Sequence, residues 1–249
     1  MTVPEYVPTR PRTDWAWRGG PEFTAPDGSH IRLDRPGLNS SQPWSCAFVA
    51  RAPGARDGLT VAEIGAFDWH VTYTMPGAEV TATPFAGGEL LVASLREPPE
   101  YRAAWRGQWF ELHHRAPGPV PAGGGVGRVF DALRLTDTPT GMLASPRTAA
   151  VRFEPFQVAK AVPGIGALRI GRPGEAGFDI PRFRGRSTRH GEIWRRPLGD
   201  GARGRARDEL LLLATSTAVT QLIPGPRDTA DADTALAFLE ELTVSWEPA

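Results

Sequence analysis

The chain has few of the residues that cross-link, anchor or export a protein. Its 249 residues include one cysteine, Cys46, which excludes an intrachain disulfide and a zinc site built from several cysteines. No stretch reaches the roughly 18 apolar residues needed to span a bilayer. The first residues also lack the apolar segment of a secretory signal peptide. The sequence therefore predicts a cytoplasmic protein without a transmembrane segment.

The chain also lacks net charge. It has 28 basic and 28 acidic residues, so it has no overall electrostatic attraction to nucleic acid or to membranes. Lys160 is the only lysine, and such a preference for arginine is typical of proteins encoded by GC-rich bacterial genomes. Nucleic acid is therefore not a favoured partner of the chain as a whole.

The composition predicts a folded chain built from many short elements. Hydrophobic residues make up 41% of the chain, which is enough for a core. Its 25 prolines are about twice the usual share, and they interrupt regular structure often. The segments between these breaks are β-like. The expected strands are His30–Asp34, Cys46–Ala50, Leu59–Ile64, Trp69–Met75, Glu79–Thr83, Glu89–Leu95, Gln108–Arg115, Arg128–Leu135, Ala150–Val158, Ala167–Ile170, Glu192–Arg196 and a short strand in the C-terminal tail.

Two helices are expected near the C-terminus. The first would be the almost unbroken apolar segment 208–223, ended by Pro224, and the second would run from about Thr229 to Leu242 with leucines at helical spacing. The predicted fold is thus mainly β, a barrel or a sandwich of about ten to twelve short, mostly antiparallel strands, with two C-terminal helices and an α+β character overall. Residues 1–28 would form an extended Pro-rich arm. Residues 29–249 would form a single β-rich domain, or two halves joined by the Gly/Pro loop 116–127.

One order of elements resembles a known group. A β-barrel threaded by a nearly all-apolar helix close to the C-terminus is similar to the Tubby and phospholipid-scramblase-like group, with DELLLLATSTAVTQLI as the helix. The resemblance implies a closed barrel and a lipid-linked role. The second helix after Pro226 departs from it, and no functional residue is carried over.

Positive charge gathers in one stretch. Between Arg182 and Arg207 lie nine arginines opposed only by Glu192 and Asp200, which leaves 19 basic and 26 acidic residues in the rest of the chain. Arginine forms a rigid fork for phosphate or carboxylate. If the segment were a strand, alternate arginines would share one face. The expected ligand-binding residues are Arg182, Arg184, Arg186 and Arg189. The alternatives are a solvated loop and pairing with the acidic segment around Asp231.

A second candidate site contains histidine. His70 follows Asp68 by two residues on an expected strand, and Glu111 and His113 are two apart on another. If these strands were neighbours, His70, Glu111 and His113 could hold a metal or act in catalysis, because two histidines and a carboxylate are a common ligand set. The alternative is that they are ordinary polar residues of half-exposed strands.

Other candidates carry weaker signals. Cys46 begins an apolar run, as a core cysteine does. GGGVGR lacks the GK[ST] of a phosphate-binding loop and is not expected to open a helix.

The sequence thus favours a binding or accessory protein that recognises an anionic ligand through its Arg-rich segment. The ligand would be a phosphorylated or carboxylated small molecule, a nucleotide or a lipid headgroup. The alternatives are a metal-dependent enzyme with a His/Glu site, and a structural or protein-interaction module whose arm, with Trp15 and Trp17, clasps a partner. No particular cofactor is indicated.

Overall fold

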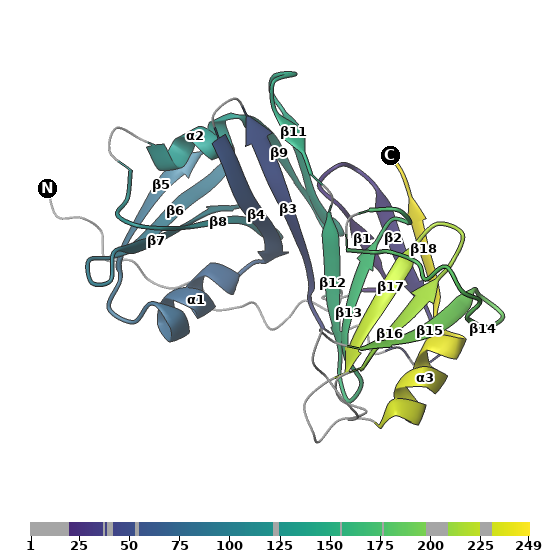
Figure 1. Cartoon of the computed structure of the whole chain (residues 1–249). Coiled ribbons are helices and arrows are strands. Elements are labelled where there is room, and N and C mark those ends of the chain that lie inside the picture. The colour runs from purple at the N-terminus through teal and green to yellow at the C-terminus, as the bar shows by residue number, and fades with distance from the viewer. Residues whose placement is uncertain are drawn as a thin grey trace, which may run out of the picture. The chain divides into compact units, whose positions relative to one another are not determined.

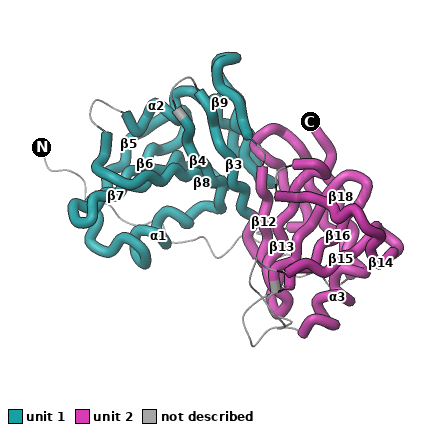
Figure 2. Tube along the Cα trace, viewed as in Figure 1, with its two compact units in different colours: residues 1–16, 45–154 teal, residues 17–44, 155–249 magenta. Residues whose placement is uncertain are grey.

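The computed structural model describes residues 20–36, 38, 42–52, 55–121, 125–154, 156–175, 177–197, 209–224 and 231–249. These residues form two compact units (Figure 2). Unit 1 contains the described residues of the range 45–154, and unit 2 contains those of the ranges 17–44 and 155–249. Residues 1–19, most of the predicted arm, lie outside the described residues.

Unit 1 is built on an antiparallel sheet. Its strands run in the order β11-β3-β4-β8-β7-β6-β5 (Figure 1). Their bounds are β3 Trp44–Ala52, β4 Ala55–Glu63, β5 Glu79–Phe85, β6 Gly88–Leu95, β7 Glu100–Arg106, β8 Phe110–Pro117 and β11 Arg152–Phe153. A separate hairpin pairs β9, Leu133–Thr138, with β10, Gly141–Pro146.

Helix α1, Ala66–Thr74, covers one face of this sheet. The expected strand Trp69–Met75 is therefore wrong. Phe67, Val71 and Met75 recur every fourth residue, so in a helix they form one apolar stripe. Phe67 and Met75 are buried with Leu91, Ala93 and Ala104 of the sheet, and Val71 packs against them. The burial of this stripe outweighs the weak strand preference of the intervening threonines.

The β9–β10 hairpin fixes the turn between β7 and β8. Asp137 on β9 accepts a hydrogen bond from the backbone N–H of Trp109 at 2.5 Å, within the turn. A Cβ built on Gly107 would overlap the Asp137 carboxylate, so this close approach needs glycine. Burial raises the pKa of Asp137 to about 6, against the effect of the backbone donors around it.

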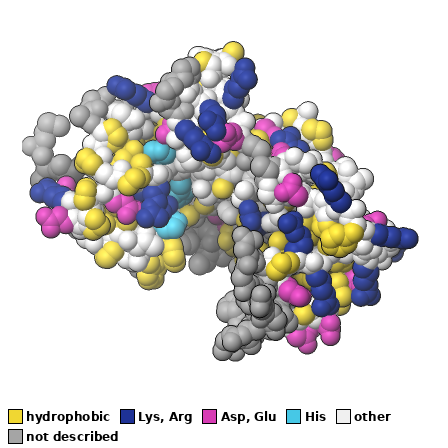
Figure 3. All heavy atoms as spheres, viewed as in Figure 1, with side chains coloured by type: hydrophobic (Ala, Val, Ile, Leu, Met, Phe, Trp, Pro, Cys, Tyr) yellow, Lys and Arg dark blue, Asp and Glu magenta, His cyan; other side chains and the backbone are white. Residues whose placement is uncertain are grey.

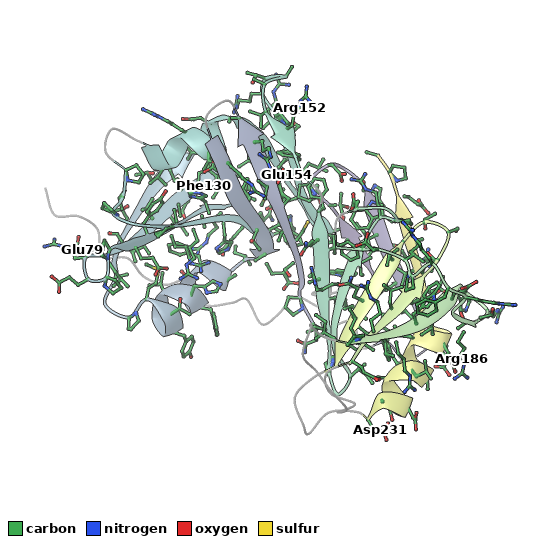
Figure 4. All side chains as sticks on the ribbon, viewed as in Figure 1. Glu79, Phe130, Arg152, Glu154, Arg186 and Asp231 are labelled. Atoms are coloured by element: carbon green, nitrogen blue, oxygen red, sulfur yellow. The ribbon has the colours of Figure 1, made fainter. Side chains whose placement is uncertain are left out.

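Helix α2, Gly125–Asp131, precedes β9. The expected strand Arg128–Leu135 is thus wrong in its first half, and the Gly-rich segment does open a short helix. Phe130 of α2 is fully buried, and its side chain points toward the sheet (Figure 4). An apolar anchor of this kind explains why the segment is helical despite its glycines.

Unit 2 contains two antiparallel ladders. One has the order β18-β2-β1, and the other has the order β14-β15-β16-β17-β13-β12. Their bounds are β1 Glu22–Thr24, β2 His30–Asp34, β12 Gln157–Val162, β13 Gly166–Gly171, β14 Arg186–Ser187, β15 Glu192–Pro197, β16 Glu209–Ala214, β17 Val219–Pro224 and β18 Thr243–Glu247. Across the described residues the ladders stay open and form no closed barrel, which leaves a sandwich-like, mainly β structure.

The expected helix over residues 208–223 is wrong. Its described residues form the β16–β17 hairpin. Leu211, Leu212 and Leu213 are all buried, so this strand has contacts on both faces and shows no polar alternation. Thr215 makes the turn, because its Oγ1 accepts the N–H of Ala218 at 3.1 Å. The resemblance to the Tubby and scramblase group rested on a threading helix and a closed barrel, and the described residues form neither.

The second expected helix is confirmed as α3, Ala232–Glu241. Asp231 caps it by accepting the N–H of Thr234 at 2.8 Å. Within the described ranges, no helix is long and apolar enough to cross a bilayer.

Most of the expected strands are confirmed, with each end within four residues of its expected position, as β2, β3, β4, β5, β6, β8, β13, β15 and β18. Strand β7 was not predicted. Six of its seven residues are buried, so EYRAAWR places arginines inside the unit and shows no exposed polar face.

Replacing Leu212 by alanine should destabilise unit 2 strongly. Leu212 is fully buried in a cluster with Phe178 and Trp194. The free energy of unfolding should fall by about 2–5 kcal/mol, measured by urea denaturation. Leu210→Ala is the control, since Leu210 is only half-buried and should cost clearly less. Equal losses at both positions would contradict the deeper burial of Leu212.

Candidate functional site

Strand register gathers charged side chains beneath α1. On β7 and β8, Arg106 lies opposite Glu111, Ala104 opposite His113 and Arg102 opposite Arg115. Alternate residues of a strand share a face, so these side chains all lie on one side of the sheet. It is the side covered by α1, because Glu111 bonds to the start of that helix.

Glu111 is the centre of the arrangement. Its side chain is completely buried. One carboxylate oxygen accepts the N–H of Gly65 at 3.1 Å and Nε of Arg106 at 2.7 Å. The other accepts the N–H of Phe67 at 2.7 Å and Nε2 of His113 at 3.0 Å. These donors lower the pKa of Glu111 although burial alone would raise it, so the carboxylate is ionised.

Arg106 joins this carboxylate to a second one. Its guanidinium lies 3.0 Å from Asp68 of α1, and both side chains are buried. The two carboxylates raise the pKa of Arg106 against the effect of burial. Asp68, Arg106 and Glu111 thus form a buried network that ties α1 to β7 and β8.

His70 and His113 lie beside this network. Their ring centroids are 6.1 Å apart. Nε2 of His113 lies 3.0 Å from the carboxylate of Glu111, so Nδ1 is the ring nitrogen left for another partner. Within the described part of the chain, Nδ1 of each histidine is buried and has no hydrogen-bond partner.

Arg102 is the exceptional residue of this face. Only 9% of its surface is exposed. Within the described ranges its Nε has no hydrogen-bond partner, and its guanidinium takes part in no ion pair. The side chain opposite is Arg115, which is exposed and pairs with Glu100 at 2.8 Å. Burial and the charge of Arg115 lower the pKa of Arg102.

The two arginines make the surroundings of His70 positive. Burial and, after it, the charges of Arg102, His113 and Arg115 together lower the pKa of His70 from 6.5 to about 4, although Glu111 raises it. We refer to Arg102, Arg115, His70 and His113 as the Arg–His cluster. Figure 3 shows histidine side chains beside arginines on the viewed face of unit 1. The positive charges of this cluster can attract an anion, and the imidazole of His70 can accept a hydrogen bond at neutral pH.

The structure brings together the three residues His70, Glu111 and His113, though His70 comes from a helix. Glu111 is already engaged by four donors. Among the described residues, no group of three or more His, Cys, Asp or Glu side chains is placed to hold a metal ion. Cys46 lies buried in β3.

The Arg-rich stretch is less organised than expected. Of the four expected ligand-binding arginines, only Arg186 lies in a strand, the two-residue β14, so Arg182 and Arg184 do not line a strand face with it. Arg186 pairs with Glu240 of α3 at 2.7 Å, and Figure 4 shows it next to that helix. Arg182, Arg184 and Arg189 are exposed. Arg203, Arg205 and Arg207 lie outside the described residues.

The sequence-based search missed the arginines of β7, together with Arg115. Arg102 and Arg106 are four residues apart in a strand that was not recognised, and their position opposite β8 depends on register. One signal was present in EYRAAWRGQWFELHHR, where a short turn separates two segments. In each segment charged or polar residues recur two or four positions apart, as on one face of a strand.

The chain matches no protein-family model, no curated protein and no solved structure. The chemistry of the Arg–His cluster is therefore the basis for a functional proposal.

Replacing Glu111 by glutamine should unfold unit 1 more easily. The change removes one of the two carboxylates that pair with buried Arg106, and breaking a buried ion pair on one side costs about 3–5 kcal/mol. Urea denaturation measures the loss. The matched control is Glu79→Gln, which breaks an exposed pair with Arg96 and should cost at most about 1 kcal/mol. Similar losses in both variants would contradict the central role of Glu111.

His70 should titrate near pH 4, which NMR of its ring protons measures directly. Between the unfolded pKa of 6.5 and the folded pKa, only the unfolded chain binds this proton, so the free energy of unfolding should fall as the pH decreases through that window. Arg102→Met removes a neighbouring positive charge and should raise the pKa of His70. The control Arg96→Met should not, because Arg96 is exposed and bonded to Glu79. A midpoint near 6.5 in the unchanged protein would contradict this electrostatic description.

Proposed function

We propose that the protein binds an anionic small molecule, carrying a phosphate or a carboxylate, at the Arg–His cluster of unit 1. The observation that supports this most strongly is Arg102, a residue that is only 9% exposed and takes part in no ion pair within the described ranges. A buried charge is costly unless it is paired. A bound anion would supply the missing partner.

The neighbours of Arg102 add to the attraction. Arg115 stands directly opposite on β8, and two like charges in this position repel each other. Glu100 bonds to Arg115 and also raises the pKa of Arg102, but burial and the charge of Arg115 outweigh this effect. An anion between the two guanidinium groups would relieve the repulsion. It would also offset the positive field that lowers the pKa of His70.

Hydrogen-bonding groups at the cluster suit an oxyanion. A guanidinium presents a planar fork of donors that matches the oxygens of phosphate or carboxylate. Arg102 is nearly buried, whereas Arg115 is exposed, so one fork is fixed by its surroundings and the other can close on a ligand. The imidazole of His70 adds a group that gains a proton more easily once an anion is bound.

The proposal keeps the class of ligand predicted from the sequence but moves the site. In the expected Arg-rich segment the charge of Arg186 is already offset by Glu240. Exposed arginines such as Arg182 hold an anion weakly, because water competes and salt screens the attraction. The partly enclosed cluster in unit 1 is screened less.

Titration with inorganic phosphate tests the proposal. Phosphate should shift the ring resonances of His70 and raise its pKa, because a negative charge arrives beside it. Arg102→Met should weaken phosphate binding at least about tenfold, as expected for the loss of a charge-assisted bond. Arg182→Met is the matched control and should leave binding unchanged. If phosphate leaves His70 unaffected, or if Arg182→Met weakens binding as much as Arg102→Met, the proposed site is wrong.

A further inference from the structure

Two large aromatic side chains stand exposed on α1. Trp69 is 54% exposed and Tyr73 is 69% exposed. They are four residues apart, so they lie on the same side of the helix, and their ring centroids are 5.4 Å apart. The buried core of unit 1 uses other residues of α1, namely Phe67 and Val71. The folding of unit 1 therefore does not account for the position of this aromatic pair.

Ring contacts connect the aromatic pair to the Arg–His cluster. The indole of Trp69 lies 5.1 Å from the imidazole of His70, in an edge-on arrangement. His70 in turn lies 6.1 Å from His113. A continuous series of rings thus leads from exposed Tyr73 through Trp69 to His70, where the positive surroundings begin.

This continuity points to one class of ligand. We infer that the anion bound by the cluster carries a planar ring, which stacks on Trp69 and Tyr73 while its phosphate or carboxylate pairs with Arg102 and Arg115. The inference rests on the proposed function and specifies its ligand. A nucleoside monophosphate and an aryl phosphate share the required chemistry, a flat ring joined to a charged group.

Charge and shape both favour such a ligand over a purely apolar one. An apolar partner would cover Trp69 and Tyr73 but would bring no counter-charge to Arg102. Stacking on an indole accepts any flat ring, because every such ring has a π face. Ring and charge would therefore contribute separately, and each can be removed by one substitution.

Four probes separate the two contributions. Inorganic phosphate carries only the charge, adenosine carries only a ring, and AMP and phenyl phosphate carry both. AMP or phenyl phosphate should bind at least about tenfold more tightly than phosphate or adenosine. The His70 ring resonances measure occupation of the cluster by NMR, and quenching of tryptophan fluorescence measures stacking. A preference for AMP over phenyl phosphate would identify a nucleotide, and the reverse would identify an aryl anion.

Variants assign the contributions to residues. Trp69→Ala should weaken the ring-bearing anion about tenfold and leave phosphate unchanged, whereas Arg102→Met should weaken both. Trp69→Phe keeps a ring and should restore much of the affinity. Phe183→Ala is the control, since Phe183 is also an exposed aromatic side chain, 66% exposed, in unit 2. Thermal unfolding of each variant shows whether its fold is intact.

The outcomes distinguish this inference from the proposed function. If phosphate binds through Arg102 but a ring adds no affinity, or Trp69→Ala has no effect, the ring-bearing ligand is wrong and the anion site stands. If no anion shifts the His70 resonances, both are wrong. If light scattering shows that Trp69 and Tyr73 hold two copies of the chain together, the aromatic pair serves an interface and the inference is overturned.

Discussion

The Glu111 carboxylate is buried on β8, and the free-energy cost of removing its charge from water must be offset by its neighbours. Four donors do so, two from the backbone where α1 begins, one from Arg106 and one from His113. These contacts fix the position and direction of α1 over the sheet. Everything proposed for unit 1 depends on them, because α1 carries His70 and both exposed aromatic side chains.

This arrangement divides the charges beneath α1 into two groups. Asp68, Arg106 and Glu111 satisfy one another and hold elements together. Arg102 lies two alternations from Arg106 on β7 and, within the described ranges, forms no ion pair. A protein that needed only stability would gain little from such a residue, since a charge of this kind is costly to bury. Its presence is most simply explained by a charge that arrives from outside.

The sequence predicted several strands in which buried and exposed residues alternate. Strand β2 alternates buried and exposed residues regularly, and its bounds are as predicted. The prediction failed where that contrast disappears. Leu211, Leu212 and Leu213 are apolar in succession because the strand is covered on both faces, and a short run of this kind cannot be told from a buried helix by periodicity.

Helix α1 shows the opposite error. Over seven residues, WHVTYTM fits a strand by alternation, but it also places Trp69 and Tyr73 four apart, as a helix does. The deciding interaction, the carboxylate of Glu111 at the start of the helix, comes from a residue more than forty positions away. Glu111 and His113 are two residues apart, so their spacing alone suggested a site. Arg102 and Arg115 are thirteen residues apart, and only the β7–β8 register places them opposite each other.

The scarcity of two residue types has a practical consequence. The single thiol, Cys46, is buried in unit 1, and the single lysine, Lys160, is buried in unit 2, where its ammonium group donates to the carbonyl of Gln42 at 2.6 Å and lies over the ring of Trp44. A buried thiol or amine reacts only when its surroundings open. Each unit therefore contains its own chemical reporter. A thiol reagent and a lysine reagent, followed side by side, would record the opening of the two units separately in one unlabelled chain.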